Sequence, residues 1–477
     1  MKVKADRKTE YSKILSAQKP LLDAFETTYD RLCEPARTDL KKDVMKLTVS
    51  AVFAPTLNAF VIDTLHKAIK EGIEELYFLA RDAYFMYLCA CEYVEKYNLP
   101  IKCKYLYVSR YSLRVPLFHR DIDKAMDYIT LGGIDVTPEK VMNRTGLDEE
   151  LKNKFATRIA NRFGIGVGKQ IPRDKLINLK EYLKNDTEFI DELVSKSKEE
   201  YPKLLAYLKQ EGFAMKYSGI VDSGWVGSMQ QSLGRLSRDL WKHDFLQGYY
   251  FGLYELPKGA YEENYHAYYF KPNHGLDKKS SFSNCLFEGV FTAPYGMTIS
   301  YMTTPEGVVP CKEEIPEKRK EIINFIGDIF DSYQECILDE EYSFEELARI
   351  AGSRSTKKII QKLLTLFMTE PSHDEAFIFG NMDFTDDVIE YKGKVLATEL
   401  SESDMRDNHL SSRIWQEIIT KITHKKPIIK QSAWYEGSVV LYGNEENRSK
   451  HFRGYKLYKY VMQYKKTINW NRHKKAG

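Results

Sequence analysis

The sequence predicts an α/β protein with a parallel-sheet core, a large helical insertion and helical additions at both ends. Three short apolar segments support this fold class, because each has the length of a buried strand and ends in polar residues. They are residues 76–80, 105–108 and 218–221. Two aromatic-rich segments, 245–254 and 267–270, also have the composition of strands.

The most informative stretch is 218–230, Ser-Gly-Ile-Val-Asp-Ser-Gly-Trp-Val-Gly-Ser-Met-Gln. Its apolar strand ends in Asp222, a loop with Gly224 and Gly227 follows, and a helix is predicted to begin near Ser228, its expected N-cap. The first N–H groups and positive dipole end of such a helix favour an anion. The pattern is typical of a phosphate site with a carboxylate beside it for sugar hydroxyls. An ordinary strand-to-helix turn has the same appearance.

Polar residues also end the two other predicted strands. Arg81 and Asp82 follow the first strand, and Ser109 and Arg110 follow the second. Because the carboxyl ends of parallel strands form the ligand-binding edge of an open sheet, these residues and Asp222 are expected to meet there. Two arginines beside a phosphate-type loop indicate a polyanionic small ligand.

Four separated motifs occur in one order along the chain: FLARDAYFMY, KYLYVSRYSLRVP, IVDSGWVGSMQ and NCLFEGVFTAPYGMTISY. Together they resemble the phosphoribosyltransferase-like glycosyltransferases of bacterial O-antigen and capsular polysaccharide biosynthesis. Members of that family often stand beside, or are fused to, a haloacid-dehalogenase-type phosphatase. The resemblance covers roughly residues 52–301. It departs from the family at Ala83, where the motif usually has a glycine after Ala-Arg-Asp.

The resemblance implies a phosphoribosyltransferase-like core that transfers 5-phosphoribosyl from phosphoribosyl pyrophosphate (PRPP) to a hydroxyl of a growing polysaccharide. The transfer would be inverting, and a separate phosphatase would then dephosphorylate the β-ribofuranosyl 5-phosphate. Asp222 would hold the ribose hydroxyls, and Mg²⁺ would be bound mainly through the pyrophosphate, with no metal site of the protein's own. The residues implied to bind PRPP are Arg81, Ser109, Arg110, Asp222, Ser223, Gly224, Trp225, Val226, Gly227 and Ser228.

The expected catalytic residues are Arg81, Asp82 and Glu288. Arg81, with Arg110, would stabilise the negative charge that grows on the leaving pyrophosphate. An acceptor hydroxyl is a poor nucleophile and needs a general base, for which Asp82 and Glu288 are both candidates. Glu288 lies inside an apolar segment, where an acid needs either a salt-bridge partner or a functional role.

The expected domain organisation follows the motifs. The insertion would be a cap or acceptor region over the ligand edge, or a purely structural subdomain. The expected parts are N-terminal helices packed on the core (1–75), the phosphoribosyltransferase-like core (76–120 and 212–310), the helical insertion (121–211) and a helical C-terminal region with a basic aromatic tail (311–477).

Two other functional classes remain open. A haloacid-dehalogenase-type phosphatase needs an Asp-x-Asp motif at the end of a first strand, and the Asp121-Ile-Asp123 sequence follows Phe-His-Arg instead. A non-catalytic PRPP- or nucleotide-binding regulator would keep Asp222 and the glycine loop without a base. The presence of Asp82 and Glu288 beside the arginines favours an enzyme, and release of pyrophosphate would distinguish the two.

Composition sets the outer limits. The 477 residues are 43% hydrophobic and 29% charged with a net charge of +3, which fits a globular chain of two or three domains and does not indicate nucleic acid as a partner. Seven scattered cysteines fit a reduced cytoplasm. The first ten residues lack an apolar signal core, and no segment is expected to be long enough to span a membrane. A cytoplasmic location is therefore expected.

The C-terminal segment from Lys450 contains interleaved basic and aromatic residues and no acid. Such a surface can lie on anionic headgroups, which suits a lipid-linked or oligosaccharide glycan acceptor at the inner face of the membrane. Binding to another polyanion, or a solvated helix, fits the same composition.

Overall fold

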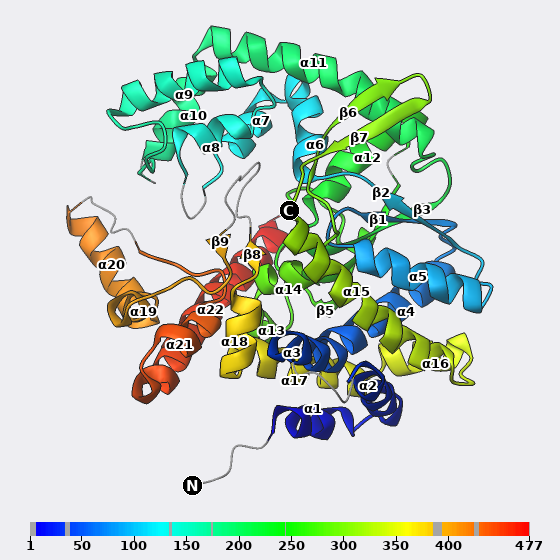
Figure 1. Cartoon of the computed structure of the whole chain (residues 1–477). Coiled ribbons are helices and arrows are strands. Elements are labelled where there is room, and N and C mark those ends of the chain that lie inside the picture. Colours follow the sequence, from blue (N-terminus) through cyan, green and yellow to red (C-terminus); the bar gives the residue numbers. More distant parts are fainter. Residues whose placement is uncertain are drawn as a thin grey trace.

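The computed structural model describes residues 6–33, 39–132, 136–172, 175–243, 245–384, 394–423 and 429–476. Its centre is a five-stranded sheet in the order β2-β1-β3-β4-β5, in which all pairs are parallel (Figure 1). This confirms the predicted α/β class with a parallel sheet. The strands are β1 (Glu75–Leu79), β2 (Lys102–Leu106), β3 (Ser218–Trp225), β4 (Gln247–Leu253) and β5 (Tyr265–Phe270).

The strand order creates a topological switch point between β1 and β3. From β1 the chain moves outward to β2, then crosses back to place β3 on the other side of β1, where Phe78 pairs with both Tyr105 and Val221. The connections that leave β1 and β3 therefore diverge in opposite directions. In open parallel sheets, ligands bind in the crevice that this divergence leaves at the carboxyl ends of the strands.

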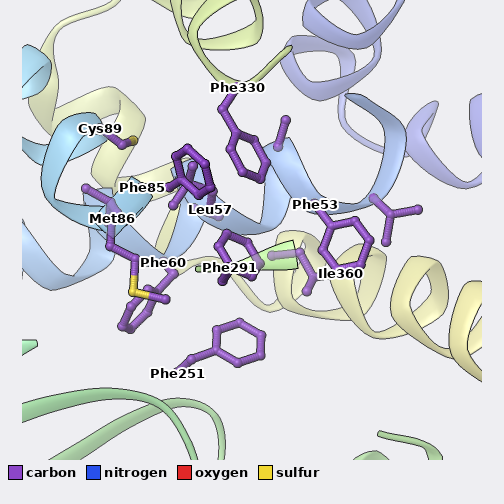
Figure 2. Packing of buried hydrophobic residues seen from close by; sticks show 14 of the residues in the cluster. Phe53, Leu57, Phe60, Phe85, Met86, Cys89, Phe251, Phe291, Phe330 and Ile360 are labelled. Carbon is purple, nitrogen blue, oxygen red and sulfur yellow. The ribbon is translucent and has the colours of Figure 1, made fainter. Parts of the chain in front are cut away.

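One face of the sheet packs against the largest hydrophobic core. Figure 2 shows Phe53 and Phe60 from the N-terminal helices, Phe251 from β4, and Phe330 and Ile360 from the C-terminal region in a single cluster. The regions expected to add to the core at both ends are thus one packed body with it. The helices that contribute side chains to this core are α1 (Arg7–Leu15), α2 (Lys19–Leu32), α3 (Leu40–Thr48), α4 (Ala54–Lys70), α5 (Tyr84–Lys96), α15 (Glu317–Leu338), α16 (Phe344–Gly352), α17 (Arg354–Thr369) and α18 (His373–Gly380).

The expectation that no segment has transmembrane length is wrong for residues 40–70. A π-helical turn (Val49–Phe53) joins α3 to α4, and the continuous helix is long and apolar enough to cross a membrane. However, 89% of its most apolar window is buried inside the protein. Its apolar character is accounted for by the core, as in a soluble protein.

The opposite face of the sheet carries Tyr77, Leu79 and Ile220 in a second core. This core includes a β-hairpin, β6 (Thr298–Thr304) and β7 (Gly307–Lys312), which the sequence did not predict. The expected domain boundary after residue 310 falls inside β7. The helices on this side are α12 (Ser228–Trp241) and the end of α11 (Thr187–Gln210).

The insertion is helical, as predicted, and has its own hydrophobic core. It lies above the carboxyl edge of the sheet in Figure 1 and continues from two short helices that follow β2. Thr137 caps a helix that begins with Pro138, a residue that is favoured at the first helical position. The elements are α6 (Arg110–Arg114), η2 (Val115–Arg120), α7 (Ile122–Ile129), α8 (Pro138–Asn143), α9 (Glu149–Phe163), α10 (Leu176–Lys184) and α11.

The remaining elements either lie between β4 and the β6–β7 hairpin or follow α18 along the chain. Short helices connect β5 to the hairpin, and the last helix runs back from the edge of the molecule toward the sheet (Figure 1). They are η4 (Glu262–Asn264), α13 (Leu276–Ser281), α14 (Asn284–Val290), the strand pair β8 (Asp383–Phe384) and β9 (Lys394–Val395), α19 (Glu402–Asp407), α20 (Leu410–Thr423), α21 (Tyr435–Tyr442) and α22 (Glu445–Ala476).

The shared core makes a prediction about stability. Phe53 is fully buried and its ring lies 5.4 Å from that of Phe367 and 5.9 Å from that of Phe291. Phe53→Ala should lower the free energy of unfolding by about 3–5 kcal/mol, because it leaves a cavity between three segments of the chain. Phe377→Ala, at a position 56% exposed, is the matched control and should stay within about 0.5 kcal/mol. Urea unfolding followed by circular dichroism measures both, and equal losses would contradict a single shared core.

Candidate functional site

A cavity of about 660 Å³ lies at the switch point between β1 and β3. The ends of β1, β2 and β3 form one wall, and α7 and α8 of the insertion form part of the other, so the insertion does border the ligand edge. Every site residue proposed from the sequence lines this one cavity. These residues are Arg81, Asp82, Ser109, Arg110, Asp222, Ser223, Gly224, Trp225, Val226, Gly227, Ser228 and Glu288.

The glycine loop has the backbone that its sequence suggests. Gly224, Trp225 and Gly227 all have positive φ, at 112°, 69° and 69°. A Cβ atom on Gly224 would lie 2.5 Å from the carbonyl oxygen of Gly252, so β3 and β4 approach each other more closely than any other residue type would allow. The loop therefore turns sharply out of the sheet into the cavity.

The prediction that Ser228 caps the following helix is wrong by one residue. Gly227 is the N-cap of α12, and its lack of a side chain leaves the first N–H groups of the helix without a side-chain cap. Ser228 is the first helical residue, and its hydroxyl accepts a hydrogen bond of 3.2 Å from Nη2 of Arg114. The start of α12 thus presents both backbone N–H groups and a guanidinium to the cavity.

Three carboxyl groups share the cavity, and all three have raised pKa values. Burial is the main cause for Asp82, Asp222 and Glu288 alike. The negative charge of Asp82 then raises the pKa of the other two further, and brings that of Glu288 to about 7. Like charges that raise one another's pKa resist simultaneous ionisation, and of the three acids Glu288 has a pKa close to neutral pH.

The cations of the site oppose this effect. Arg81 follows β1 after a cis Ala80–Arg81 peptide bond, and Arg110 begins α6. Both lower the pKa values of Asp82 and Glu288, and the Ser223 hydroxyl donates a 2.6 Å hydrogen bond to Asp82. These three groups therefore offset part of the rise in the pKa of Asp82 that burial causes.

Glu288 has a partner that the sequence did not predict. It lies on α14, and the indole N–H of Trp225 donates a hydrogen bond to its Oε1 atom. Among the residues that the structure describes, no ion pair involves Glu288, which argues against a purely structural salt-bridged role. A neutral donor leaves the carboxylate able to accept a proton.

Ser109, which was expected to bind PRPP, uses its hydroxyl for hydrogen bonds within the protein. Its hydroxyl accepts a 2.9 Å hydrogen bond from the N–H of Ser112 in a capping box, and donates one of 2.6 Å to the carbonyl of Thr298. Its donor is therefore used within the protein. We conclude that Ser109 positions Arg110 and fixes the β6 hairpin against α6.

Several cations that line the cavity were not predicted from the sequence. Arg114 lies one turn beyond Arg110, and its guanidinium packs 4.6 Å from the ring centroid of Tyr128. Burial and the charge of Arg110 lower the pKa of Arg114. The four-residue spacing from Arg110 was a usable signal for this residue. The cavity is also lined by Lys124, Lys140 and Arg144 of the insertion and by Arg235 of α12, for which the sequence offered no such signal.

No cluster of three or more histidine, cysteine, aspartate or glutamate side chains within the described ranges is arranged to hold a metal ion.

A scan against protein-family models finds no matching family, and a search of curated proteins finds no match to this sequence. Fold and site define an α/β protein with a mixed arginine–carboxylate cavity at a topological switch point. The functional assignment depends on this cavity and on the motifs that form it.

The raised pKa of Glu288 makes a stability prediction that does not depend on function. An unfolded glutamate titrates at about 4.3, whereas folded Glu288 titrates at about 7, so the fold favours its protonated form. Folding stability should therefore fall as pH rises from about 4.5 to 7. Glu288→Gln keeps an acceptor for Trp225 but cannot ionise. The melting temperature of this variant minus that of the wild type should grow across this window and level off above it.

Calorimetric scans between pH 5 and 8 measure this difference. The exposed Glu306→Gln variant is the control and should track the wild type. A difference for Glu288→Gln that does not change with pH would contradict the assigned pKa.

Proposed function

We propose that this protein is a PRPP-dependent glycosyltransferase that moves 5-phosphoribosyl to a hydroxyl of a growing bacterial polysaccharide. One observation carries the proposal: Asp222, Arg81, Arg110 and the start of α12 line a single cavity at the switch point. The resemblance of the four motifs to phosphoribosyltransferase-like glycosyltransferases implies the same grouping of residues around PRPP.

In this proposal the donor lies along the carboxyl edge of β3. The 5-phosphate binds the N–H groups between Gly224 and Ser228 with the guanidinium of Arg114 beside them. Asp222 accepts hydrogen bonds from the ribose hydroxyls. Arg81 and Arg110 face the pyrophosphate, where bidentate guanidinium contacts suit phosphate oxygens.

The carboxylate cluster fits a donor that arrives with a divalent cation. Three acids with raised pKa values would be stabilised in their ionised forms by positive charge nearby. Mg²⁺ held by the pyrophosphate would supply that charge and offset the negative charge of the leaving group. Asp82 and Asp222 are the side chains placed to orient such a complex, directly or through water.

Glu288 is the better candidate for the general base. Burial raises the pKa of Asp82, but Ser223 and the two arginines oppose that rise. Glu288, with a pKa of about 7, is part ionised at neutral pH and matched to the task. Its carboxylate would take the acceptor proton as the acceptor oxygen bonds to C1 and pyrophosphate leaves with the electron pair of the broken C1–O bond. Attack opposite the pyrophosphate gives the β-ribofuranosyl 5-phosphate.

The structure gives the Asp121-Ile-Asp123 sequence a structural role, which disfavours the phosphatase alternative. Asp121 caps α7 by accepting from the N–H of Lys124, and Asp123 pairs with Lys184 at 2.6 Å. We therefore assign the later dephosphorylation to a separate haloacid-dehalogenase-type phosphatase. A PRPP-binding regulator remains the second interpretation of this cavity, and only release of pyrophosphate separates it from a transferase.

The donor assignment predicts saturable binding of PRPP in the presence of Mg²⁺. Asp222→Asn should weaken that binding about 10–100-fold, because it removes a charged acceptor for the ribose hydroxyls. Asp191→Asn, an exposed position on α11, should leave it unchanged. Isothermal titration measures all three proteins, with nucleotide sugars as competing donors. Binding of a nucleotide sugar in place of PRPP would sink the donor assignment.

We also propose peripheral contact with the inner face of the membrane, and the structure shifts the expected surface. The basic aromatic helix α22 packs partly against the body, since Lys459 donates to the carbonyl of Phe282 and Trp470 packs against the second core. Helix α22 still exposes Leu457, Tyr460, Met462 and Tyr464, and five further exposed apolar side chains form one stripe of α20, which projects from the molecule in Figure 1. These five are Ile414, Trp415, Ile418, Ile419 and Ile422, between 41% and 74% exposed.

Anionic lipid is the partner that fits this surface. Lys421 lies on α20, and Lys425 and Lys426 follow it in the sequence, while α22 beside it adds exposed Lys456 and Lys465. An isoleucine and tryptophan stripe flanked by lysines is typical of helices that lie in a headgroup layer.

Vesicle co-sedimentation tests this surface. The protein should bind vesicles with about 30% anionic lipid and not neutral vesicles. A Trp415→Asp, Ile418→Asp double variant should lose the binding, whereas Met302→Asp, at a site 54% exposed on β6, should keep it. Light scattering serves as a further check. A change of oligomeric state in the double variant without any lipid binding would show that α20 faces a second copy of the chain and would overturn the proposal.

A further inference from the structure

A second cavity, of about 320 Å³, lies behind the glycine loop. Trp225 and Val226 line both this cavity and the donor cavity, so the loop separates the two. The other walls come from α13, α14, α21 and α22. The second cavity thus lies between the sheet core and the C-terminal helices, a region to which the motifs assigned no role.

Three lysines and two glutamates line this second cavity. Lys279 is 2% exposed, and its Nζ atom donates a 2.7 Å hydrogen bond to the carbonyl of Pro272. Burial, followed by the charge of Lys466, lowers the pKa of Lys279 to about 8. Lys459 lies 3.7 Å from Glu436, and Lys466 lies 3.5 Å from Glu255. Of the three lysines, Lys279 therefore has no carboxylate partner of its own within this lining.

Gln463 adds an amide group to the lining of the second cavity. Its Oε1 atom is buried, and no hydrogen-bond donor in the described part of the chain reaches it. A buried acceptor without a donor costs about 1–3 kcal/mol unless something supplies the missing hydrogen bond. A ligand hydroxyl would do so once the Gln463 side chain rotates toward the cavity, because its Oε1 atom is covered in this conformation.

The lining suits a saccharide that carries negative charge. It combines ammonium, carboxylate and amide groups, which can donate to and accept from hydroxyls, with tyrosine rings such as Tyr254 and Tyr455 that offer apolar faces. The excess of lysine over glutamate favours an anionic group on the sugar, either a carboxylate or a phosphate.

Helix α14 borders both cavities. Asn284 lines the second cavity, and Glu288, four residues later and on the same side of the helix, lines the first. Trp225 borders both and donates its hydrogen bond to Glu288. A sugar held in the second cavity would therefore approach the base along the Trp225 ring.

We propose that the second cavity is the acceptor subsite and that it binds an anionic saccharide. The name acceptor subsite depends on the proposed transferase function, whereas the binding of an anionic saccharide in this cavity does not. The bound sugar would offer a hydroxyl to Glu288 past Trp225, while the anionic group is attracted by the three lysines of the lining, which outnumber its two glutamates.

Saccharide binding to the full chain tests the proposal without any turnover. The probes are a uronic-acid-containing tetrasaccharide, glucose 1-phosphate and neutral maltotetraose, followed by isothermal titration or saturation-transfer NMR. At least one anionic probe should bind, and maltotetraose should bind about tenfold more weakly or not at all. Preference for the uronic acid or for the phosphate identifies the source of the charge.

A Lys459→Gln, Lys466→Gln variant should weaken binding of the anionic probe at least about tenfold and leave the affinity for Mg²⁺–PRPP unchanged. Lys465→Gln, an exposed neighbour on α22 outside the lining, is the matched control and should behave like the wild type. Wild-type protein that binds PRPP but none of the anionic probes would overturn the subsite. Loss of PRPP binding with saccharide binding retained would instead refute the donor assignment and leave the saccharide site in place.

Discussion

The structure around the switch point depends on one electrostatic constraint. Asp82, Asp222 and Glu288 are held close enough for the charge of Asp82 to raise the pKa values of the other two, and Arg81 and Arg110 oppose this effect. Such a cluster is tolerated because it lines a cavity, where water or a charged ligand can stabilise it. A donor that brings both a cation and a polyanion would satisfy the acids and the arginines together. A simple anion would satisfy only the arginines.

The backbone at the end of β3 positions the residues around Glu288. Gly224 brings the end of the strand against Gly252, and Trp225, in the left-handed conformation, donates its hydrogen bond to Glu288 on α14. Because only Val226 and Gly227 lie between the end of β3 and the start of α12, the loop must leave the sheet abruptly. Trp225 consequently stands between two cavities. The same residue fixes Glu288 and divides the space on either side of it.

What the sequence could predict was local. Arg81 and Asp82 follow the end of β1 as predicted, because the carboxyl ends of parallel strands converge whatever the rest of the chain does. The predicted end of a strand at Asp222 was wrong, since β3 continues to Trp225 and pairs with β4 through Gly224, yet Asp222 still lines the cavity. The helical start at Ser228 was found, but its N-cap was misplaced by one residue because a serine there is the commoner capping choice. The apolar helix over 40–70 was misjudged because its polar residues, such as Asn58 and Asp63, interrupt the hydrophobic pattern yet are themselves buried.

What the sequence could not predict depends on contacts between distant segments. The hydroxyl of Ser109 is committed to Thr298, 189 residues away, and the cations of the insertion reach the cavity only through the packing of α7 and α8. The second cavity is the extreme case, since α22 closes it from the far end of the chain. That helix also packs beside α20, which carries the exposed isoleucine stripe. In the proposed function, a saccharide bound in the second cavity would contact Lys459 and Lys466 of α22, so the C-terminal region, which carries none of the four motifs, would select the acceptor.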